Sequence, residues 1–110
     1  MTDKDRLHEM FDMQFRFMKR LKVTKATPDN LRTMFTAITV ELAELMQELN
    51  WKPWKKTRKY SDTDKVLEEY VDVFHFVMEL GLLLGICPRV LYEAYLEKMR
   101  VNIKRQKGGY

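Results

Sequence analysis

Apolar side chains recur at three- and four-residue steps along most of the chain, which is the spacing of one face of an α-helix. Proline and glycine residues interrupt this pattern and divide it into four helical segments, expected at about 3–21, 28–50, 61–84 and 88–106. No stretch alternates between apolar and polar positions with a period of two, so no β-strand is expected. The sequence therefore predicts a single all-α domain over residues 1–110, folded as a four- to five-helix bundle.

The second and third segments each carry an apolar stripe, which we interpret as the seam that faces the core. Beside this seam, and not opposite it, each segment carries a stripe with several acidic residues. This placement puts carboxylates next to the buried face of both helices. The predicted seams are Phe35, Ile38, Leu42, Leu45 and Leu49 on the second segment, and Val66, Tyr70, Val73, Val77, Leu80 and Leu84 on the third.

Four of the carboxylates form two pairs, Glu41 with Glu44 and Glu69 with Asp72, each at spacing i, i+3. Such residues lie one turn apart on the same helix face, with Cβ atoms roughly 5–6 Å apart. If the two helices pack together, the four groups converge, and without a cation they repel one another and their pKa values rise. Mg²⁺ resolves this repulsion, because it binds carboxylate oxygens, water and substrate phosphates. The alternative is a set of solvated charges beside the core; the repetition on both helices favours the metal site.

Basic residues are concentrated in two places, the loop at 51–60 and the last helical segment. The loop also holds two tryptophans, and Lys98, Asn102 and Arg105 share one face of the last segment because they follow steps of four and three. Basic side chains interleaved with aromatic ones can hold phosphates and stack a base. The alternative is a solvated basic helix end that complements the helix dipole. Carboxylates together with separate basic groups are typical of phosphoryl chemistry.

The overall charge and the cysteine content narrow the class of protein. A formal net charge of +4 favours an anionic partner or substrate. A single cysteine excludes an internal disulfide framework and a cysteine-rich zinc site, and it favours a reducing, cytoplasmic location. The longest apolar stretch, 77–87, is interrupted by Glu79 and is too short to span a bilayer. No apolar run follows the charged first residues, so we expect no secretory signal and no membrane partner.

The paired carboxylates resemble the E-x-x-E…E-x-x-D signature of the all-α nucleoside triphosphate pyrophosphatases, the MazG-like superfamily. Within it, the chain most resembles the dimeric all-α dUTPases found in phages, some bacteria and trypanosomatids. Three segments are similar to that narrower family: the tryptophan loop at 50–56, the closing K-x-x-x-N-x-x-R-Q-x-x-G-Y segment at 98–110, and the glutamine-bearing stretch at 11–14. The acidic motif specifies only the superfamily, whereas the closing segment is more specific.

The resemblance implies hydrolysis of dUTP, and of dUDP, to dUMP. By this resemblance, two or more Mg²⁺ ions, or Mn²⁺ in their place, would be bound by Glu41, Glu44, Glu69 and Asp72. Glu44 would also orient or deprotonate the attacking water, which relatives direct at the β-phosphorus. The implied phosphate contacts are Lys98, Arg105 and Tyr110, together with Lys55 from the loop, and Asn102 would lie near the sugar or a phosphate. The implied base contacts are Gln14 and, from the loop, Trp54.

Two departures from the family concern base selectivity. Relatives often carry asparagine one turn after the glutamine, where this chain has Phe17, and larger members have an inserted helical region that is absent here. A broader MazG-like dNTP pyrophosphatase with another base preference is therefore the main alternative. A non-catalytic helical interaction protein is the second, but it has no use for four converging carboxylates. Nucleic-acid binding is not expected, because the acidic stripes would repel phosphate unless metal fills them.

Apolar residues also lie outside the predicted seams of the two central helices. A helix that is apolar around most of its circumference must be buried on several sides. A chain this short supplies too few helices to cover both, so we expect a homodimer that completes the core. The resemblance agrees, since relatives dimerise and some small related enzymes form tetramers. These additional apolar residues are Met46, Phe74, Phe76, Met78, Leu82 and Leu83.

Overall fold

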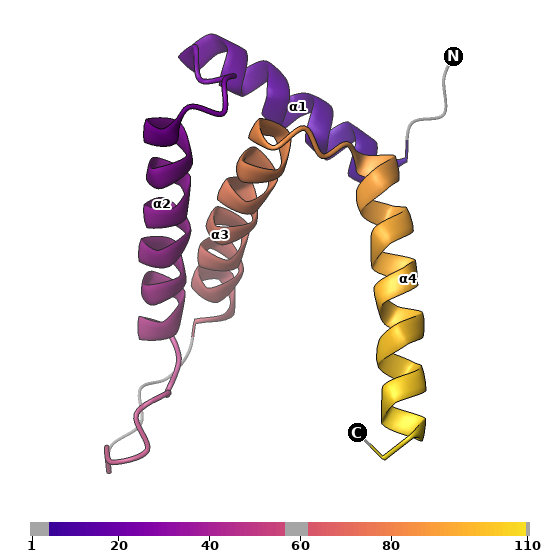
Figure 1. Ribbon diagram of the computed structural model, residues 1–110. Coiled ribbons are helices and arrows are strands. Elements are labelled where there is room, and N and C mark those ends of the chain that lie inside the picture. Colours follow the sequence, from indigo (N-terminus) through magenta and orange to yellow (C-terminus); the bar gives the residue numbers. More distant parts are fainter. Residues whose placement is uncertain (1–4, 57–61, 110) are drawn as a thin grey trace.

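The computed structural model describes residues 5–56 and 62–109, and this part of the chain contains helices and no strand (Figure 1). The predicted all-α class is confirmed. The four helices are α1 (Arg6–Leu21), α2 (Pro28–Gln47), α3 (Thr63–Leu83) and α4 (Pro88–Lys107).

Side-chain caps set the beginnings of the first three helices. Each capping oxygen accepts hydrogen bonds from backbone N–H groups of the first turn, which have no partner within the helix. Because the caps lie at residues 5 and 62, α1 and α3 begin slightly later than predicted. Helix α2 ends at Gln47, before the predicted residue 50. The bonds run from the N–H of His8 to Asp5, from that of Asn30 to Thr27, and from those of Asp64 and Lys65 to Asp62.

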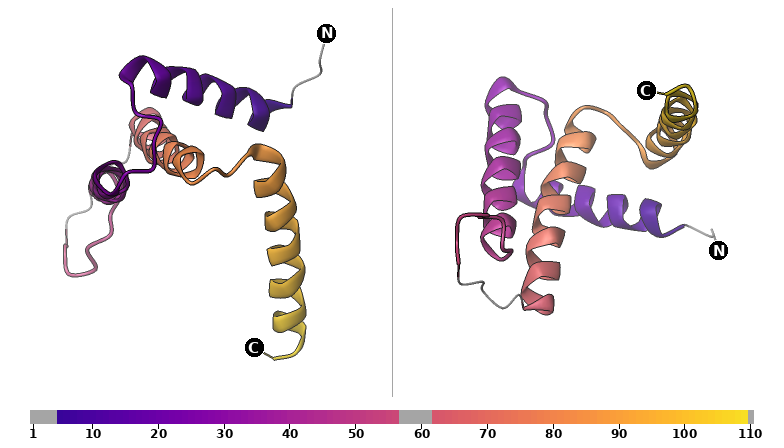
Figure 2. Two further views of the ribbon diagram at one scale, coloured as in Figure 1. Left: turned by 45° about the horizontal axis from the view of Figure 1, so that its top comes forward. Right: turned by 90° about the horizontal axis from the view of Figure 1, so that it is seen from below.

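The helices form a packed group of three and a fourth that stands apart. Helices α2 and α3 run side by side in opposite directions, and α1 crosses over the end where α2 begins and α3 ends (Figures 1 and 2). Among the described residues, α4 packs only on α1. Gly85, at φ 77°, lies in the connection that turns the chain from α3 into α4. The predicted four- to five-helix bundle is therefore not closed within one chain, because α4 is directed away from α2 and α3.

No single helix in the described part of the chain combines the length and hydropathy of a membrane span. Helices α3 and α4 taken together pass the same test by length and composition, across a bend of 106°. No membrane is present in the structure.

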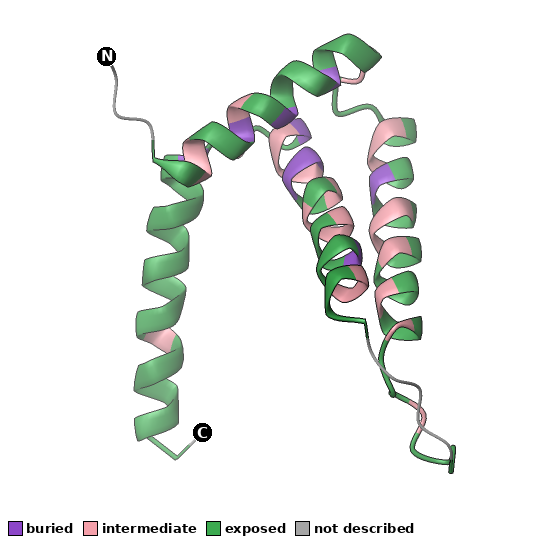
Figure 3. Ribbon diagram, turned by 180° about the vertical axis from the view of Figure 1, so that it is seen from behind, coloured by how far each residue is buried: buried purple, intermediate pink, exposed green. Residues whose placement is uncertain are grey.

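The core is small and lies where α1, α2 and α3 meet. Met18, Met34 and Leu83, one from each helix, form its buried cluster. Phe11 and Met78 are also buried. Figure 3 shows the buried segments on the lower side of α1 and on the facing sides of α2 and α3, whereas α4 is exposed almost throughout.

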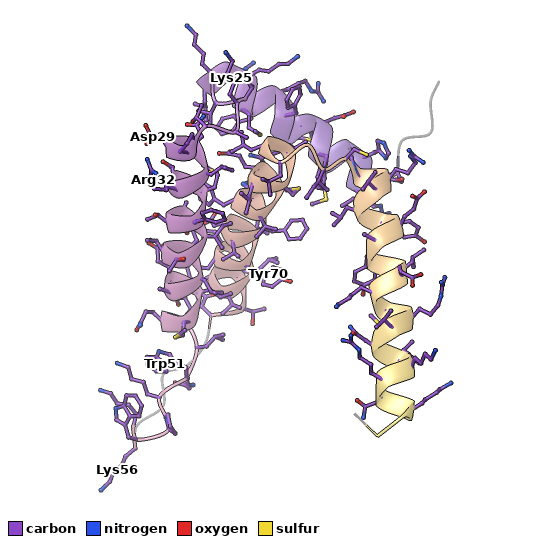
Figure 4. The ribbon with its side chains drawn as sticks, viewed as in Figure 1. Lys25, Asp29, Arg32, Trp51, Lys56 and Tyr70 are labelled. Atoms are coloured by element: carbon purple, nitrogen blue, oxygen red, sulfur yellow. The ribbon has the colours of Figure 1, made fainter. Side chains whose placement is uncertain are left out.

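The predicted core seams are correct only in part for a single chain. Leu80 packs against the buried cluster, and Ile38, Leu45, Val66 and Val73 are half-buried, but the other seam residues are exposed. Phe35 on α2 is 54% exposed and Tyr70 on α3 is 60% exposed. Tyr70 points away from α2, toward the side on which α4 stands (Figure 4). The α2 surface that faces α3 is shifted toward the neighbouring stripe, in which Met34 is buried and Glu41 is half-buried. The physical reason is that each central helix has two stripes, and its partner within the chain covers the one that carries the carboxylates. Also exposed from the predicted seams are Leu42, Leu49, Val77 and Leu84.

Candidate functional site

The packing of α2 against α3 brings three of the four predicted carboxylates together. One oxygen from each of Glu41, Glu69 and Asp72 lies within 4.8 Å of the other two. Glu69 and Asp72 share a face because they lie one helical turn apart on α3, and Glu41 faces them from α2. Glu69 is buried, and the other two are half-buried. The arrangement concentrates negative charge at a site that is largely withdrawn from water.

Glu44, the fourth predicted carboxylate, lies one turn beyond Glu41 and is exposed to solvent. Its side chain is hydrogen-bonded to that of Glu41. The pKa of Glu41 is raised above 4.5, first because partial burial disfavours the charged form, and then because of this hydrogen bond and the charges of Glu44, Asp72 and Glu69. Glu44 thus occupies the solvent side of the cluster, where water can reach it.

Two carboxylate oxygens in the cluster have no hydrogen-bond partner in the structure. They are Oε2 of Glu41 and Oε2 of Glu69, and both are fully buried. Buried polar atoms are nearly always paired, so unpaired ones suggest a partner such as an ion or water. A hard divalent cation takes carboxylate oxygens as ligands. Glu41, Glu69 and Asp72 therefore fit a metal ion by donor type, by spacing and by their unsatisfied oxygens.

Lys65 is a member of the site that the sequence interpretation missed. Its Nζ lies 3.1 Å from Oε1 of Glu69, one turn along α3. The pKa of Lys65 is raised by the hydrogen bond to Glu69 and by the charges of Glu68 and Glu69. The i, i+4 spacing of lysine and glutamate was the available signal. The ammonium group of Lys65 is half-exposed and pairs with Glu69. It does not neutralise the charges of Glu41 and Asp72 in the same way.

Gln14, predicted to contact the base, lies in the interface between α1 and α3. Its Nε2 donates a hydrogen bond of 3.1 Å to Oε1 of Glu79. Both side chains are buried, with 8% of Gln14 and 6% of Glu79 exposed. Burial raises the pKa of Glu79, while the hydrogen bond from Gln14 and the nearby His75 oppose that rise.

The sequence interpretation did not single out Glu79 as the partner of Gln14, although Glu79 interrupts the apolar stretch at 77–87. It follows Asp72 by seven residues on α3, so it lies on nearly the same face, roughly 10 Å further along the helix axis. The α3 surface therefore presents two polar positions in line, the carboxylate cluster and the Gln14–Glu79 pair.

The tryptophan loop lies at the opposite end of the α2–α3 pair from α1, beyond the end of α2 (Figures 1 and 4). Trp54 is 66% exposed, and its ring meets that of Trp51 edge to face, with centroids 5.6 Å apart. Lys55 is exposed beside it. The two predicted base contacts, Gln14 and Trp54, are therefore not brought together within one chain.

The basic residues of α4 are also separated from the carboxylate cluster. Lys98, Asn102 and Arg105 are exposed, and among the described residues α4 packs on α1 alone. Tyr110 lies outside the described residues. Within the described residues, one chain therefore does not bring these α4 side chains to the predicted metal ligands.

Comparison with known proteins places the chain in a family. The model of a family described as dUTPase matches residues 6–90. The chain belongs to this dUTPase family. The expected resemblance is thus confirmed, and the match includes all four carboxylates, the tryptophan loop and Gln14. The closing segment at 98–110 lies beyond the matched residues.

One curated relative belongs to a phage. It is a protein of Enterobacteria phage LZ5 named dCTP pyrophosphatase, 28% identical over 94 residues, an alignment that covers 74% of this chain and 55% of that protein. The chain therefore spans about half the length of this relative. No solved structure gave a significant match.

Proposed function

We propose that this member of the dUTPase family is a metal-dependent nucleoside triphosphate diphosphatase that hydrolyses dUTP, and dUDP, to dUMP and so removes dUTP from the nucleotide pool. The observation that carries the proposal is the carboxylate cluster. One oxygen from each of three carboxylates lies within 4.8 Å of the other two, and Oε2 of Glu41 and Oε2 of Glu69 are buried without a hydrogen-bond partner. A helical interaction protein has no need of such a costly concentration of negative charge.

The cluster and Glu44 divide the chemistry between them. Glu41, Glu69 and Asp72 would hold Mg²⁺ or Mn²⁺, two or more ions with Glu44 included, and bound Mg²⁺ neutralises phosphate oxygens and lowers the pKa of water. Glu44 lies on the exposed side of the cluster, where it can orient a water molecule and accept its proton. Glu44 lies one helical turn from Glu41 on α2, so it stays next to the metal ligands.

The substrate contacts come from three further parts of the chain. Lys98 and Arg105 on α4, with Lys55 in the loop, carry the positive charges suited to phosphate oxygens. Asn102 shares the α4 face with Lys98 and Arg105, and can donate to the sugar or a phosphate. Tyr110 would join them, Trp54 would stack on the base, and Gln14 would bond to its edge.

The relative named for dCTP supports a second substrate. A glutamine amide carries a donor NH₂ group and an acceptor oxygen side by side. Depending on its orientation, it can pair with uracil or with cytosine. The experiment is a pyrophosphate-release panel over dUTP, dCTP, dTTP, dATP and dGTP with Mg²⁺. We expect dUTP to be the best substrate and dTTP to be poor, because a close pocket excludes the thymine methyl group. Equal rates for dUTP and for the two purine substrates would instead identify a broader pyrophosphatase.

We expect the active form to be a homodimer. Helix α4 is exposed except near Pro88 and Val101, and an isolated helix is marginal in water. Its unpartnered apolar side chains, and the exposed residues of the α2 and α3 seams, need a cover that one chain does not supply. A second copy is that cover, whether the final assembly is a dimer or a tetramer built from dimers. Light scattering should give a mass of twice 13.3 kDa or more. A stable monomer at micromolar concentration would contradict the proposal.

A dimer would also reunite the separated contacts. In one chain the loop lies at the opposite end of the α2–α3 pair from Gln14, and α4 does not pack on the cluster. If a partner chain supplies some of these contacts, two inactive variants should complement each other. Glu44→Gln and Gln14→Ala chains, unfolded and refolded together, should then recover part of the activity that each lacks alone. No recovery in heterodimers of demonstrated composition would show that these two residues act within one chain.

A further inference from the structure

The Gln14–Glu79 hydrogen bond fixes which way the glutamine amide faces. An ionised carboxylate only accepts hydrogen bonds, so it requires the NH₂ end of the amide. In the structure Nε2 of Gln14 does point at Oε1 of Glu79, at 3.1 Å. The other edge of the amide, which holds Oε1 and the second N–H, makes no hydrogen bond with the described residues. Its donor and acceptor therefore keep one spatial order.

Uracil and cytosine differ in that order. At the corresponding positions of the ring edge, uracil presents an acceptor oxygen next to an N–H donor, whereas cytosine presents an amino donor next to an acceptor nitrogen. A freely rotating amide turns over and pairs with either base. An amide held in one orientation pairs well with one base and places like groups against the other, which leaves polar groups unpaired.

We propose that Glu79 is a positioning residue, which locks the amide of Gln14 and thereby sets the preference between uracil and cytosine substrates. The inference rests on the proposed function, in which Gln14 reads the base. A purely structural explanation accounts poorly for the pair, because the other buried residues of α1 and most of those of α3 are apolar, among them Phe11, Met18 and Met78. Apolar side chains there would pack without desolvating a carboxyl group.

The test compares the ratio of kcat/KM for dUTP to kcat/KM for dCTP in four proteins. Glu79→Gln keeps the size of the side chain, but its amide can donate or accept, so it permits both orientations of Gln14. Glu79→Met keeps the length and suits the apolar interface, so it guards against a variant that fails to fold. Glu93→Gln is the matched control on α4, where Glu93 is exposed and pairs with Arg89. Circular dichroism melting confirms that each variant is folded.

In Glu79→Gln and Glu79→Met we expect the ratio to move toward unity by about tenfold, the discrimination typical of a lost bidentate base contact. The control should keep the ratio of the unmodified protein. A merely structural role would lower both rates together and leave the ratio unchanged, which would overturn the inference. A ratio near unity in the unmodified protein would overturn it too, as would failure of both Glu79 variants to fold.

The panel separates this inference from the proposed function. If the unmodified protein hydrolyses neither dUTP nor dCTP with Mg²⁺, the proposed function fails and the inference fails with it. If the unmodified protein hydrolyses one of them selectively and the Glu79 variants keep that selectivity, only the inference fails.

Discussion

Replacing Glu44 with glutamine is expected to lower kcat by at least ~10²-fold, as for the loss of a general base or a metal ligand. The substitution keeps the size of the side chain and removes its charge and its ability to take a proton. Glu44 is exposed, so its replacement removes no core contact and should leave the thermal midpoint nearly unchanged. Steady-state kinetics with saturating Mg²⁺ and dUTP, together with a thermal melt of each protein, measure both effects.

Glu93→Gln again provides the control, since it is the same substitution at an exposed position on α4. It should retain the activity of the unmodified protein. An unchanged rate in Glu44→Gln would remove Glu44 from the chemistry. A large fall in its melting temperature would assign the residue a structural role instead.

The helices and the carboxylate cluster were accessible from the sequence because both depend on local spacing. Thr27 followed by Pro28 marks the beginning of α2, and the cap and the proline act within one turn. The i, i+3 pairing of Glu69 with Asp72 places both groups on one face whatever else the chain does. Only the packing of α2 on α3 had to be assumed in order to bring Glu41 to them.

The core seams were not accessible in the same way. Each central helix has an apolar stripe beside one that mixes apolar and acidic residues, and hydrophobicity favours burying the first. In the structure Met34 and Glu41, from the mixed stripe, face α3, while Phe35 remains exposed. Which stripe meets a helix of the same chain depends on long-range geometry that periodicity does not encode. Part of the purely apolar stripe, including Phe35, Leu42 and Leu49, remains exposed, as expected if a second copy covers it.

The Gln14–Glu79 pair illustrates a second limit. Gln14 was identified through the family resemblance, but its partner lies 65 residues away along the chain. A lone glutamate inside an apolar stretch indicates a buried polar contact, but the sequence does not show which residue is its partner. Only the crossing of α1 over α3 identifies it.

Removal of divalent metal is expected to abolish hydrolysis altogether, and Mg²⁺ or Mn²⁺ should restore it. With EDTA in excess, the carboxylates of Glu41, Glu69 and Asp72 repel both one another and the substrate phosphates. Full activity in excess EDTA would refute the proposed metal site. A readout independent of turnover is the melting temperature, since a ligand that binds only the folded state stabilises it, by about 2.7 kcal/mol at 100 times its Kd. Glu69→Gln, which removes a buried ligand, should weaken that Mg²⁺-dependent shift, and Glu93→Gln should not.

The pH dependence of this effect has a definite sign. The pKa of Glu41 is raised above 4.5 in the folded protein, so the metal-free folded state holds that proton more tightly than the unfolded chain does. The contribution of Glu41 to stability is therefore fully present below 4.5 and is lost as pH rises through its folded-state pKa. Metal binding requires the same carboxyl group to be deprotonated, so Mg²⁺ competes with the proton. The Mg²⁺ concentration that gives half of the melting shift should increase as pH falls toward that pKa, and a midpoint independent of pH there would exclude Glu41 as a ligand.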